Sequence, residues 1–360
     1  MLEPLARRVW DPGASAGPAL LSLCLAPLGS AYEIAWRLRE KILRRPAQLP
    51  VPVLSIGALT VGGTGKTPVA AEVARTLMAA GVRVALLSRG YGRAGAGKLL
   101  VASDGEGNLA DASEAGDEPA MLARALPGLV AIVCADRARA GALAVSRYGA
   151  GALVLDDGFQ NRRVAKDLDI VTVNGRRPFG NGRMLPAGPL RMPASALSKA
   201  GLVIVTKLAS EDDPAPVRAM LGAMAPGAPV LEARTVPVAF RDLSTDKPLP
   251  LDAMRRRRVA AMCALAEPEH FVEGLEEQGF EVAGRFFFPD HYRYGPADIA
   301  SVRDRAHAIE AIVTTEKDAV KIDPEWLGGG PPLLALSVRT EFDDREAFER
   351  AVRRAAGIAK

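Results

Sequence analysis

Residues that could bind phosphate groups lie in one short segment, Thr60–Thr67, with the sequence TVGGTGKT. Glycines let backbone N–H groups turn towards an anion, Lys66 adds a positive charge, and the Thr67 hydroxyl can ligate Mg²⁺. The turn itself comprises Gly62, Gly63, Thr64 and Gly65. We therefore expect residues 62–67 to hold the phosphates of a nucleoside triphosphate.

The flanking elements position this loop. The apolar strand Val53–Gly57 precedes it, and a helix is expected to begin around Pro68 and to end at Gly81. The usual motif has glycine at the position of Thr60, so an ordinary glycine-rich turn is the alternative interpretation. The strand, the Gly-Lys-Thr run and the helix occur together, and this combination favours phosphate binding.

Three further groups could take part in chemistry. Asp156 and Asp157 follow an apolar strand, where phosphate-loop enzymes keep an acid that holds Mg²⁺ directly or through water; a helix cap is the alternative. Asp117 and Glu118 begin a predicted helix, where acids are common because of the helix dipole alone. Among the three histidines, His291 follows a strand and has the setting of an active-site residue; a surface histidine is the alternative.

Two other motifs indicate which nucleotide the chain binds. The segment Gly90–Gly95 matches the GxGxxG pattern after a strand, but no helix pattern follows, so we interpret it as a flexible loop over the site. GTPases carry Asn/Thr-Lys-x-Asp after a late strand, and here Thr206-Lys207-Leu208-Ala209 lacks the aspartate. ATP is therefore favoured over GTP.

Composition indicates a folded, two-domain protein. The chain has 360 residues, 49% hydrophobic and 24% charged. Its three cysteines are odd in number and lack metal-ligand spacing, which favours a reducing compartment. Residues 1–48 carry seven Lys or Arg against four acids, which gives +3 of the net charge of +4. No basic stripe with interleaved aromatic residues is evident, so nucleic-acid binding is not expected.

The N-terminal segment, residues 1–48, has the pattern of a membrane-associated helix. Pro18 and Pro27 are expected to interrupt the uncharged stretch between Asp11 and Glu33, and its densest apolar part, Ala19–Leu28, is ten residues long, whereas a full span needs about 20. Tyr32 and Trp36 could lie at headgroup depth. One helical face is apolar, at Ala31, Ile34, Ala35, Leu38 and Ile42. A helix packed on the chain's own core is the alternative; a signal peptide is disfavoured because no clear cleavage site follows.

Apolar strands alternate with helices or loops through the next part of the chain. Continuous apolar strands are typical of a parallel sheet covered on both faces, in which ligands bind at the carboxyl ends of the strands. We predict a P-loop NTPase-like α/β domain over residues 49–232. Its strands are expected at Val53–Gly57, Val82–Leu87, Val130–Cys134, Leu153–Leu155, Ile170–Val173 and Leu202–Val205.

A smaller α/β domain is expected over residues 233–340. Two strand-like segments, Val230–Phe240 and Leu333–Thr340, bracket it and are predicted to pair as a two-stranded hinge. The last segment, residues 341–360, contains a helix at Asp344–Ala356 that should return to the first domain.

Seven sequence blocks occur in one order along the chain: TVGGTGKTP (60–68), SRGYGR (88–93), GDEP (116–119), LDDGFQNRR (155–163), FGNGRMLPAGP (179–189), FPDHY (288–292) and TTEKDAVK (314–321). Together they resemble the tetraacyldisaccharide 4'-kinase family, the lipid A 4'-kinases of Gram-negative bacteria. The resemblance covers roughly residues 30 to 340.

The resemblance implies a reaction and a location. ATP, with Mg²⁺, would phosphorylate the 4'-hydroxyl of a tetraacylated glucosamine disaccharide 1-phosphate at the cytoplasmic face of the inner membrane, as a step in lipid A biosynthesis. No obligate protein partner is evident. Two other classes stay open from the residues alone: a phosphate-loop ligase acting on a soluble carboxylate, and a membrane-docked nucleotide switch. The missing acid at Ala209 speaks against the switch.

The resemblance also implies roles for individual residues. Asp117 would be the general base, tuned by His291, and Lys66 would neutralise the transferring phosphoryl group. The metal shell would comprise Thr67, Glu118, Asp156 and Asp157. Substrate or phosphate contacts would come from Arg89, Tyr91, Gln160, Arg183 and Arg191. At one position the chain departs from the family, because Asn161 stands where histidine is common.

Overall fold

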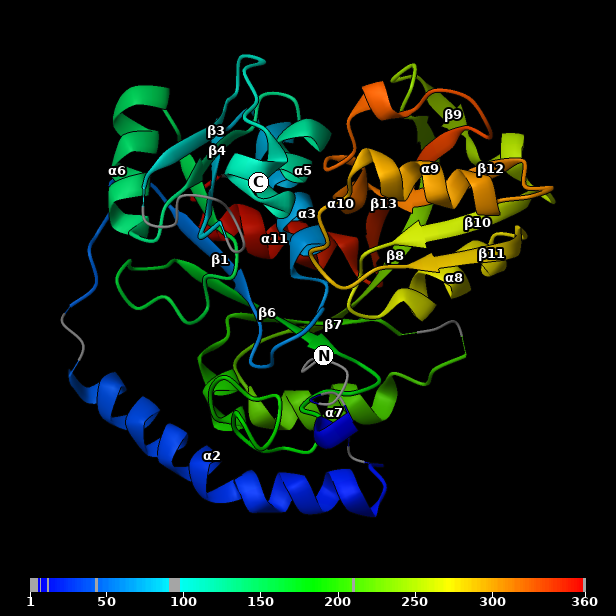
Figure 1. Cartoon of the computed structure of the whole chain (residues 1–360). Helices are drawn as coiled ribbons and strands as arrows, with labels where there is room; N and C mark the ends of the chain where they lie inside the picture. Colours follow the sequence, from blue (N-terminus) through cyan, green and yellow to red (C-terminus); the bar gives the residue numbers. More distant parts are fainter. Residues whose placement is uncertain are drawn as a thin grey trace. The chain divides into compact units, whose positions relative to one another are not determined.

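The computed structural model describes residues 6, 8–11, 13–42, 45–90, 98–208 and 211–358 (Figure 1). The chain forms two compact units. The first comprises Met1–Leu87, Asp136–Arg234 and Glu341–Lys360, and the second comprises Ser88–Ala135 and Thr235–Thr340. The sequence predicts residues 88–135 inside the 49–232 domain, and the structure differs because helix α5 (Asp117–Ala125) packs on helix α10 (Glu316–Ala319). That contact joins segments that are far apart in sequence.

A parallel sheet forms the centre of the first unit. Its strand order is β8-β7-β6-β1-β5-β2, and every neighbouring pair is parallel. All residues of β1, β2, β5 and β7 are buried, which explains their continuous apolar sequence. The strands are β1 (Val53–Gly57), β2 (Val84–Ser88), β5 (Ala152–Leu155), β6 (Leu168–Asn174), β7 (Leu202–Thr206) and β8 (Val230–Asp242). The predicted parallel sheet is confirmed.

Helices pack on this sheet and complete the first unit. They are α3 (Lys66–Ala79), α6 (Arg137–Tyr148), η1 (Ala194–Lys199), α7 (Ala215–Met224) and α11 (Arg345–Ala355). The C-terminal helix α11 packs on α3, and Arg345 donates to Glu72, whose side chain is 3% exposed, at 3.0 Å.

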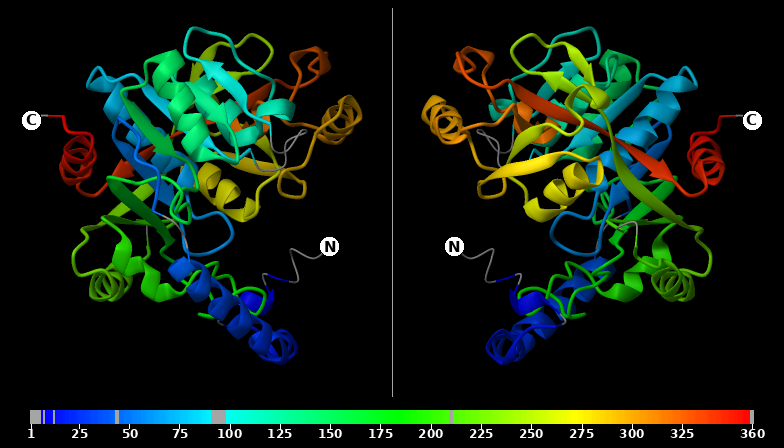
Figure 2. Two further views of the ribbon diagram at one scale, coloured as in Figure 1. Left: turned by 90° about the vertical axis from the view of Figure 1, so that its left-hand side faces the viewer. Right: turned by 90° about the vertical axis from the view of Figure 1, so that its right-hand side faces the viewer.

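Helix α2 (Ala16–Ile42) lies along the segment that joins β6 to η1 (Figures 1 and 2). The Ser22 hydroxyl donates to the Ala187 carbonyl at 2.8 Å, and a Cβ on Gly29 would lie 3.0 Å from the Met184 carbonyl oxygen. The helix is continuous through Pro27, so the expectation that proline interrupts this stretch is wrong. Proline removes its own N–H and crowds the carbonyl four residues earlier, but contacts with the neighbouring segment at Ser22 and Gly29 hold the helix on both sides of it.

Most of α2 faces outward. Its exposed large apolar side chains are Leu20, Leu21, Leu23, Leu28, Tyr32, Ile34, Leu38 and Ile42. By length and composition the helix could cross a membrane, and 11% of its most apolar stretch is buried in the protein. Such a helix near an N-terminus is weak evidence taken alone, but its exposure favours membrane association over the alternative of a core helix.

The second unit contains its own sheet, in the order β11-β10-β12-β13-β8 with β9 beside β8. Strands β10, β11, β12 and β13 are mutually parallel where they pair. Strands β8 and β13 are hydrogen-bonded neighbours, so the predicted pairing is confirmed; a hinge motion stays a prediction. The strands are β9 (Pro248–Pro250), β10 (Arg258–Cys263), β11 (Glu281–Phe287), β12 (Ala311–Thr315) and β13 (Leu333–Phe342).

Apolar clusters around β10 and β12 form the core of this unit. An antiparallel pair, β3 (Leu100–Asp104) and β4 (Val130–Val133), also belongs to it. The remaining helices are α4 (Ala112–Ala115), η2 (Leu251–Met254), α8 (Pro268–Glu277), α9 (Pro296–Arg305) and η3 (Pro324–Trp326).

Candidate active site

The loop between β1 and α3 is held by hydrogen bonds on both sides. Thr64 is buried, with 3% of the residue exposed. Its hydroxyl lies 2.9 Å from the Thr172 hydroxyl, and its carbonyl accepts from the Thr206 hydroxyl at 3.0 Å. Val61 N–H donates to the Pro189 carbonyl at 2.9 Å. The loop is therefore preorganised by strands β6 and β7 and by the segment that follows β6.

This loop has the features of a phosphate site. Helix α3 begins at Lys66, and its N-cap Gly65 has φ 70° and supplies no side-chain cap. The first N–H groups of the helix therefore have no capping side chain at that residue, and the positive end of the helix dipole lies at the loop. Gly62 has φ 102°, which disfavours other residue types. A Cβ on Gly63 would lie 3.3 Å from Lys207 Nζ, so a second cation borders the loop.

A carboxylate beside the loop carries two cationic partners. Asp157 Oδ2 accepts from Arg191 Nη1 at 2.7 Å, Oδ1 accepts from Arg191 Nη2 at 2.8 Å, and Lys66 Nζ lies 3.8 Å from Oδ1. Burial opposes ionisation, but the Arg191 hydrogen bonds and the Lys66 charge outweigh it and lower the Asp157 pKa to about 2. Asp157 is therefore ionised at neutral pH and balances the charge of Lys66.

The donor set beside the loop fits Mg²⁺ bound together with a nucleotide. Among the described residues no group of three or more His, Cys, Asp or Glu side chains gathers into a metal site. Mg²⁺ usually keeps several waters and substrate phosphate oxygens and needs one or two carboxylates. Asp156, Asp157 and Thr67 carry oxygens of this kind and belong to the first unit, and their place in a metal shell stays a prediction. Glu118 belongs to the second unit, and its place in a metal shell stays a prediction.

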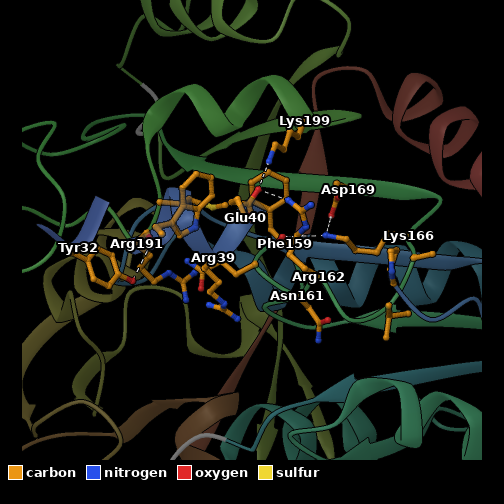
Figure 3. Close-up of a pocket in the computed structure, with 16 residues that line it drawn as sticks. Tyr32, Arg39, Glu40, Phe159, Asn161, Arg162, Lys166, Asp169, Arg191 and Lys199 are labelled. Carbon is orange, nitrogen blue, oxygen red and sulfur yellow. Dashed lines mark hydrogen bonds and ion pairs between the residues drawn. The ribbon is translucent and has the colours of Figure 1, made fainter. Parts of the chain in front are cut away.

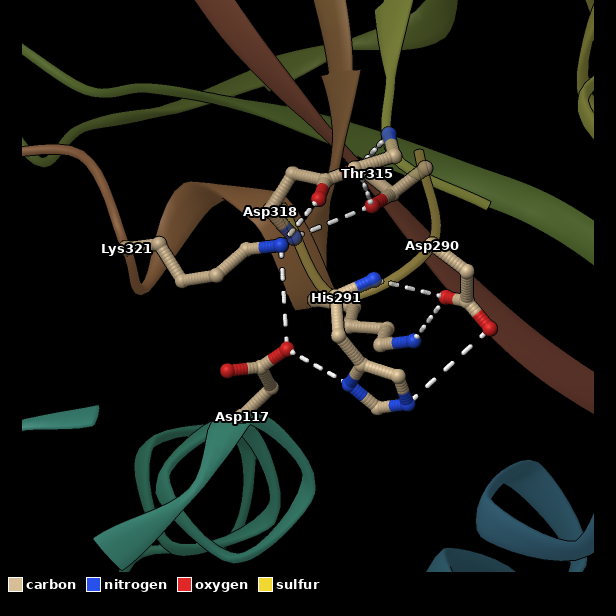
Figure 4. Close-up of polar contacts among 8 residues, drawn as sticks. Asp117, Asp290, His291, Thr315, Asp318 and Lys321 are labelled. Carbon is tan, nitrogen blue, oxygen red and sulfur yellow. Dashed lines mark hydrogen bonds and ion pairs between the residues drawn. The ribbon is translucent and has the colours of Figure 1, made fainter. Parts of the chain in front are cut away.

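The second unit contains a separate polar cluster around Asp117, the first residue of α5 (Figure 4). Asp117 Oδ2 lies 3.2 Å from His291 Nδ1 and 3.7 Å from Lys321 Nζ. His291 Nε2 lies 3.9 Å from Asp290 Oδ2, and Asp290 Oδ1 accepts from Lys317 Nζ at 2.8 Å. The imidazole thus has a carboxylate near each of its two nitrogens.

Opposite charges shift the titration of this pair in opposite directions. Burial works against ionisation of Asp117, but the His291 hydrogen bond and the charges of Lys321 and Lys317 outweigh it and lower the Asp117 pKa. The Asp117 hydrogen bond raises the His291 pKa, against a smaller opposing effect of burial. His291 also has φ 59°, a left-handed conformation that is uncommon for a residue with a Cβ and is concentrated at functional sites.

The structure gathers some predicted residues and leaves others apart. Lys66, Asp157 and Arg191 form one cluster, and Asp117 and His291 form another. Arg183 lies in the segment between β6 and η1 and is half-buried, and its carbonyl accepts from Leu190 N–H. Arg89 is exposed at the end of β2, and Tyr91, with most of the predicted loop after it, lies outside the described residues.

Gln160, Asn161 and Arg191 line a pocket of about 320 Å³ beside α2 (Figure 3). Tyr32 and Trp36 of α2 contribute its aromatic side, and the Tyr32 hydroxyl donates to the Arg191 carbonyl at 3.3 Å. The rest of the lining contains charged residues, Arg39, Glu40, Arg162, Lys166, Asp169 and Lys199, and apolar residues, Pro46, Phe159, Val164, Ala165 and Met192. The pocket therefore joins the predicted membrane helix to residues predicted to contact substrate.

Sequence reasoning gave no role to Lys207, Asp290, Lys317, Asp318 or Lys321. The last three stand in the block TTEKDAVK, which carried the resemblance but showed no chemistry by itself. The signal that was present is the i, i+3 spacing of Asp318 and Lys321, which is typical of an ion pair across one helical turn.

Comparisons with known proteins give one consistent result. Residues 21–356 match the family described as tetraacyldisaccharide-1-P 4'-kinase, LpxK. A tetraacyldisaccharide 4'-kinase of Anaeromyxobacter dehalogenans is 48% identical over 319 residues, 87% of this chain and 83% of the relative. A relative of the same name from Pelobacter propionicus is 42% identical over 310 residues, 84% of each chain. A crystal structure of LpxK from Aquifex aeolicus in complex with ATP covers 93% of this chain and 99% of its own, with 29% identity and a TM-score of 0.73.

Proposed function

This chain belongs to the tetraacyldisaccharide-1-P 4'-kinase family, and from that premise we propose which of its residues perform the reaction. The enzyme transfers the γ-phosphoryl group of ATP to the 4'-hydroxyl of tetraacyldisaccharide 1-phosphate in lipid A biosynthesis. The observation that carries the assignment of roles is the pair of ionic clusters, one around Lys66 and Asp157 and the other around Asp117 and His291.

The first unit supplies the phosphate-binding groups. Backbone N–H groups of residues 62–67 and the side chain of Lys66 hold the β- and γ-phosphates, and Thr67, Asp156 and Asp157 hold the metal, with Glu118 as a further candidate. When bound, Mg²⁺ neutralises charge on the phosphate oxygens. Arg191 keeps Asp157 in place through two parallel hydrogen bonds.

The second unit supplies the proton acceptor. The hydroxyl proton passes to Asp117 while the hydroxyl oxygen bonds to the γ-phosphorus; the bond from phosphorus to the bridging oxygen breaks, and its electron pair leaves on ADP. His291 orients the carboxylate through its 3.2 Å contact and shares the proton afterwards. A positioned base contributes typically about 10²- to 10⁴-fold to rate.

Substrate contacts are proposed at Gln160, Arg183 and Arg191 in the first unit and at Arg89 and Tyr91 in the second. Two of these residues line the pocket beside α2, which has both aromatic and cationic lining. A lipid substrate with sugar and phosphate groups has the complementary chemistry, because sugars stack on aromatic rings and phosphates pair with arginine.

We also propose that α2 binds the cytoplasmic surface of the inner membrane. Its exposed leucines would enter the acyl boundary, and Arg39 and Lys41 in its last turn would lie near anionic lipid. The three free cysteines agree with a reducing compartment. The substrate carries acyl chains, so an enzyme at the membrane surface can reach it without extracting it.

Activity is tested with γ-labelled ATP and detergent-dispersed tetraacyldisaccharide 1-phosphate. We expect label in the lipid fraction with the wild type and its loss in Lys66→Met. Label released only as inorganic phosphate, in the presence of lipid, would contradict the proposed transfer.

Membrane binding is tested by sedimentation with vesicles that contain anionic lipid. We expect Leu23→Gln/Ile34→Gln to bind less, because burying each such side chain is worth about 1.5–3 kcal/mol. The matched control is Met220→Gln, an exposed apolar residue on α7 of the same unit. Equal loss in the control, or no loss in the double variant, would argue against α2 as the anchor.

A further inference from the structure

A buried ion pair lies directly behind the Asp117–His291 contact. Asp318 on α10 is fully buried, and its Oδ2 accepts from Ala264 N–H at 2.9 Å and from the Thr315 hydroxyl at 2.8 Å. Its Oδ1 lies 2.7 Å from Lys321 Nζ. The residue that follows β10 and the last residue of β12 therefore fix Asp318, and Asp318 in turn fixes Lys321.

Lys321 has a second carboxylate partner. Its side chain is 6% exposed, and Nζ lies 3.7 Å from Asp117 Oδ2 and 5.2 Å from the centre of the Tyr294 ring. A buried lysine needs only one carboxylate to balance its charge, and Asp318 already provides it at the shorter distance. The contact with Asp117 is thus additional, and it connects the rigid β10–β12 region to the first residue of α5.

Both cationic contacts of Asp117 fall on the same oxygen. His291 Nδ1 and Lys321 Nζ approach Oδ2, and Oδ1 points to the far side of the carboxylate, away from both groups (Figure 4). A carboxylate held by two groups at one oxygen cannot rotate freely. Its second oxygen is therefore presented in a defined direction.

We propose that Lys321, anchored by Asp318, is a positioning residue that holds Asp117 through Oδ2 so that Oδ1 accepts the proton of the substrate hydroxyl. This inference rests on the proposed function, because it assumes that Asp117 is the base. It assigns different tasks to the two oxygens of one side chain and gives the TTEKDAVK block a role in the reaction.

The first test is Lys321→Met, which keeps the length of the side chain and removes its charge. The variant leaves Asp318 buried without its cation, which destabilises the fold whatever the role of Lys321 in the reaction. Asp318→Asn/Lys321→Met removes both charges together and keeps the Ala264 and Thr315 contacts within reach of the amide. Thermal unfolding of each variant, and of the exposed control Lys247→Met, establishes which proteins are folded.

We expect kcat to fall about 10²-fold in both Lys321 variants, with KM for ATP unchanged, because misplacing a reacting group by about 1 Å can cost that much. Lys321→Arg retains a cation and should recover a large part of kcat. A wild-type kcat in the folded double variant would overturn the proposal, and so would equal changes in kcat and in KM for ATP.

A further comparison separates failure of this inference from failure of the proposed function. Asp117→Asn is measured in the same assay, alone and combined with Lys321→Met. If Asp117→Asn retains wild-type kcat, the assignment of the base is wrong. If Asp117→Asn loses kcat while the folded Lys321 variants keep it, only the positioning role is wrong. We expect the combined variant to be no slower than Asp117→Asn, because Lys321 acts through that carboxylate.

Discussion

Two aspartates with cationic partners dominate the two clusters, and they differ in how many of their oxygens are engaged. Asp157 in the first unit meets Arg191 at both oxygens, and Lys66 lies near one of them. Asp117 in the second unit meets His291 and Lys321 at a single oxygen. An anion paired at both oxygens is suited to balancing fixed charge, whereas one paired at a single oxygen keeps a site for a proton.

The pKa values follow the same division. Two parallel hydrogen bonds from a guanidinium that stays charged at every physiological pH lower the Asp157 pKa to about 2. The pKa of Asp117 is also lowered, but its hydrogen-bond partner is a histidine, whose own pKa is raised by that contact. The proposed base is therefore paired with a side chain that can also carry a proton, whereas Asp157 is paired with a guanidinium that stays charged.

The largest expected effect tests this difference directly. Asp117→Ala should lower kcat by about 10²- to 10⁴-fold and leave ATP affinity near the wild-type value, because it removes the proposed base and no proposed phosphate contact. Lys66→Ala should lower both kcat and ATP affinity, since in the proposed reaction Lys66 pairs with phosphate before and during transfer. Steady-state kinetics together with equilibrium ATP binding measures both quantities. Equal losses of ATP binding in the two variants would remove the distinction between the clusters.

A smaller effect is expected at the bidentate ion pair between Arg191 and Asp157, which we call the fork. Arg191→Lys keeps the charge but loses the bidentate geometry and the bond to the Ala58 carbonyl. Hydrogen bonds to charged groups contribute about 1.5–3 kcal/mol, and because the Asp157 side chain is 40% exposed we expect the lower end of that range in urea unfolding.

The matched control for this fork is Arg218→Lys. Arg218 is an exposed arginine that pairs with Glu232 and Asp343, and pairs of that kind contribute little. A stability loss in Arg218→Lys as large as that in Arg191→Lys would show that the fork contributes no more to stability than an exposed ion pair.

The sequence alone was sufficient to predict an element where the apolar pattern of that segment reflects its burial. Strand β1 has the predicted bounds, Val53–Gly57, because a strand buried on both faces is apolar at every position. Strand β3 was not predicted, since Leu100–Asp104 mixes half-buried and polar residues. Helix α9, with the sequence PADIASVRDR, was missed as well, because its apolar stripe is narrow.

Contacts between segments that are distant in the sequence could not be predicted from the residue pattern. His291 and Asp117 are 174 positions apart, and only the family resemblance joined them in advance. Nothing in the sequence pairs Lys321 with Asp117, because no local period relates α10 to α5. The Arg191–Asp157 fork spans 34 positions and depends on the turn after β6, whose path the residue pattern does not fix.

The smallest expected effect concerns Asp290, which flanks His291 on the side opposite to Asp117. Burial works against its ionisation, but the Lys317 charge and hydrogen bond outweigh it and lower the Asp290 pKa, while Asp290 raises the Lys317 pKa against burial. A lowered carboxyl pKa stabilises the fold above the unfolded pKa of about 3.9, and that stability is lost as pH falls through the folded value. The raised Lys317 pKa stabilises the fold at all pH values below about 10.4 and so contributes no slope in this range.

We therefore expect wild type to exceed Asp290→Asn by about 1 kcal/mol in urea unfolding between roughly pH 5 and pH 9, and the difference to shrink below about pH 4. Asp246→Asn is the control, because Asp246 pairs with Arg241 at the surface with 67% of its side chain exposed, and it should show a small difference at every pH. A difference between wild type and Asp290→Asn that stays constant down to pH 3 would mean that Asp290 is not held as an anion by Lys317. Asp117 would then be the one carboxylate that stabilises His291 as an ion pair. The contrast with Asp157, which is paired at both oxygens, would apply to Asp117 alone.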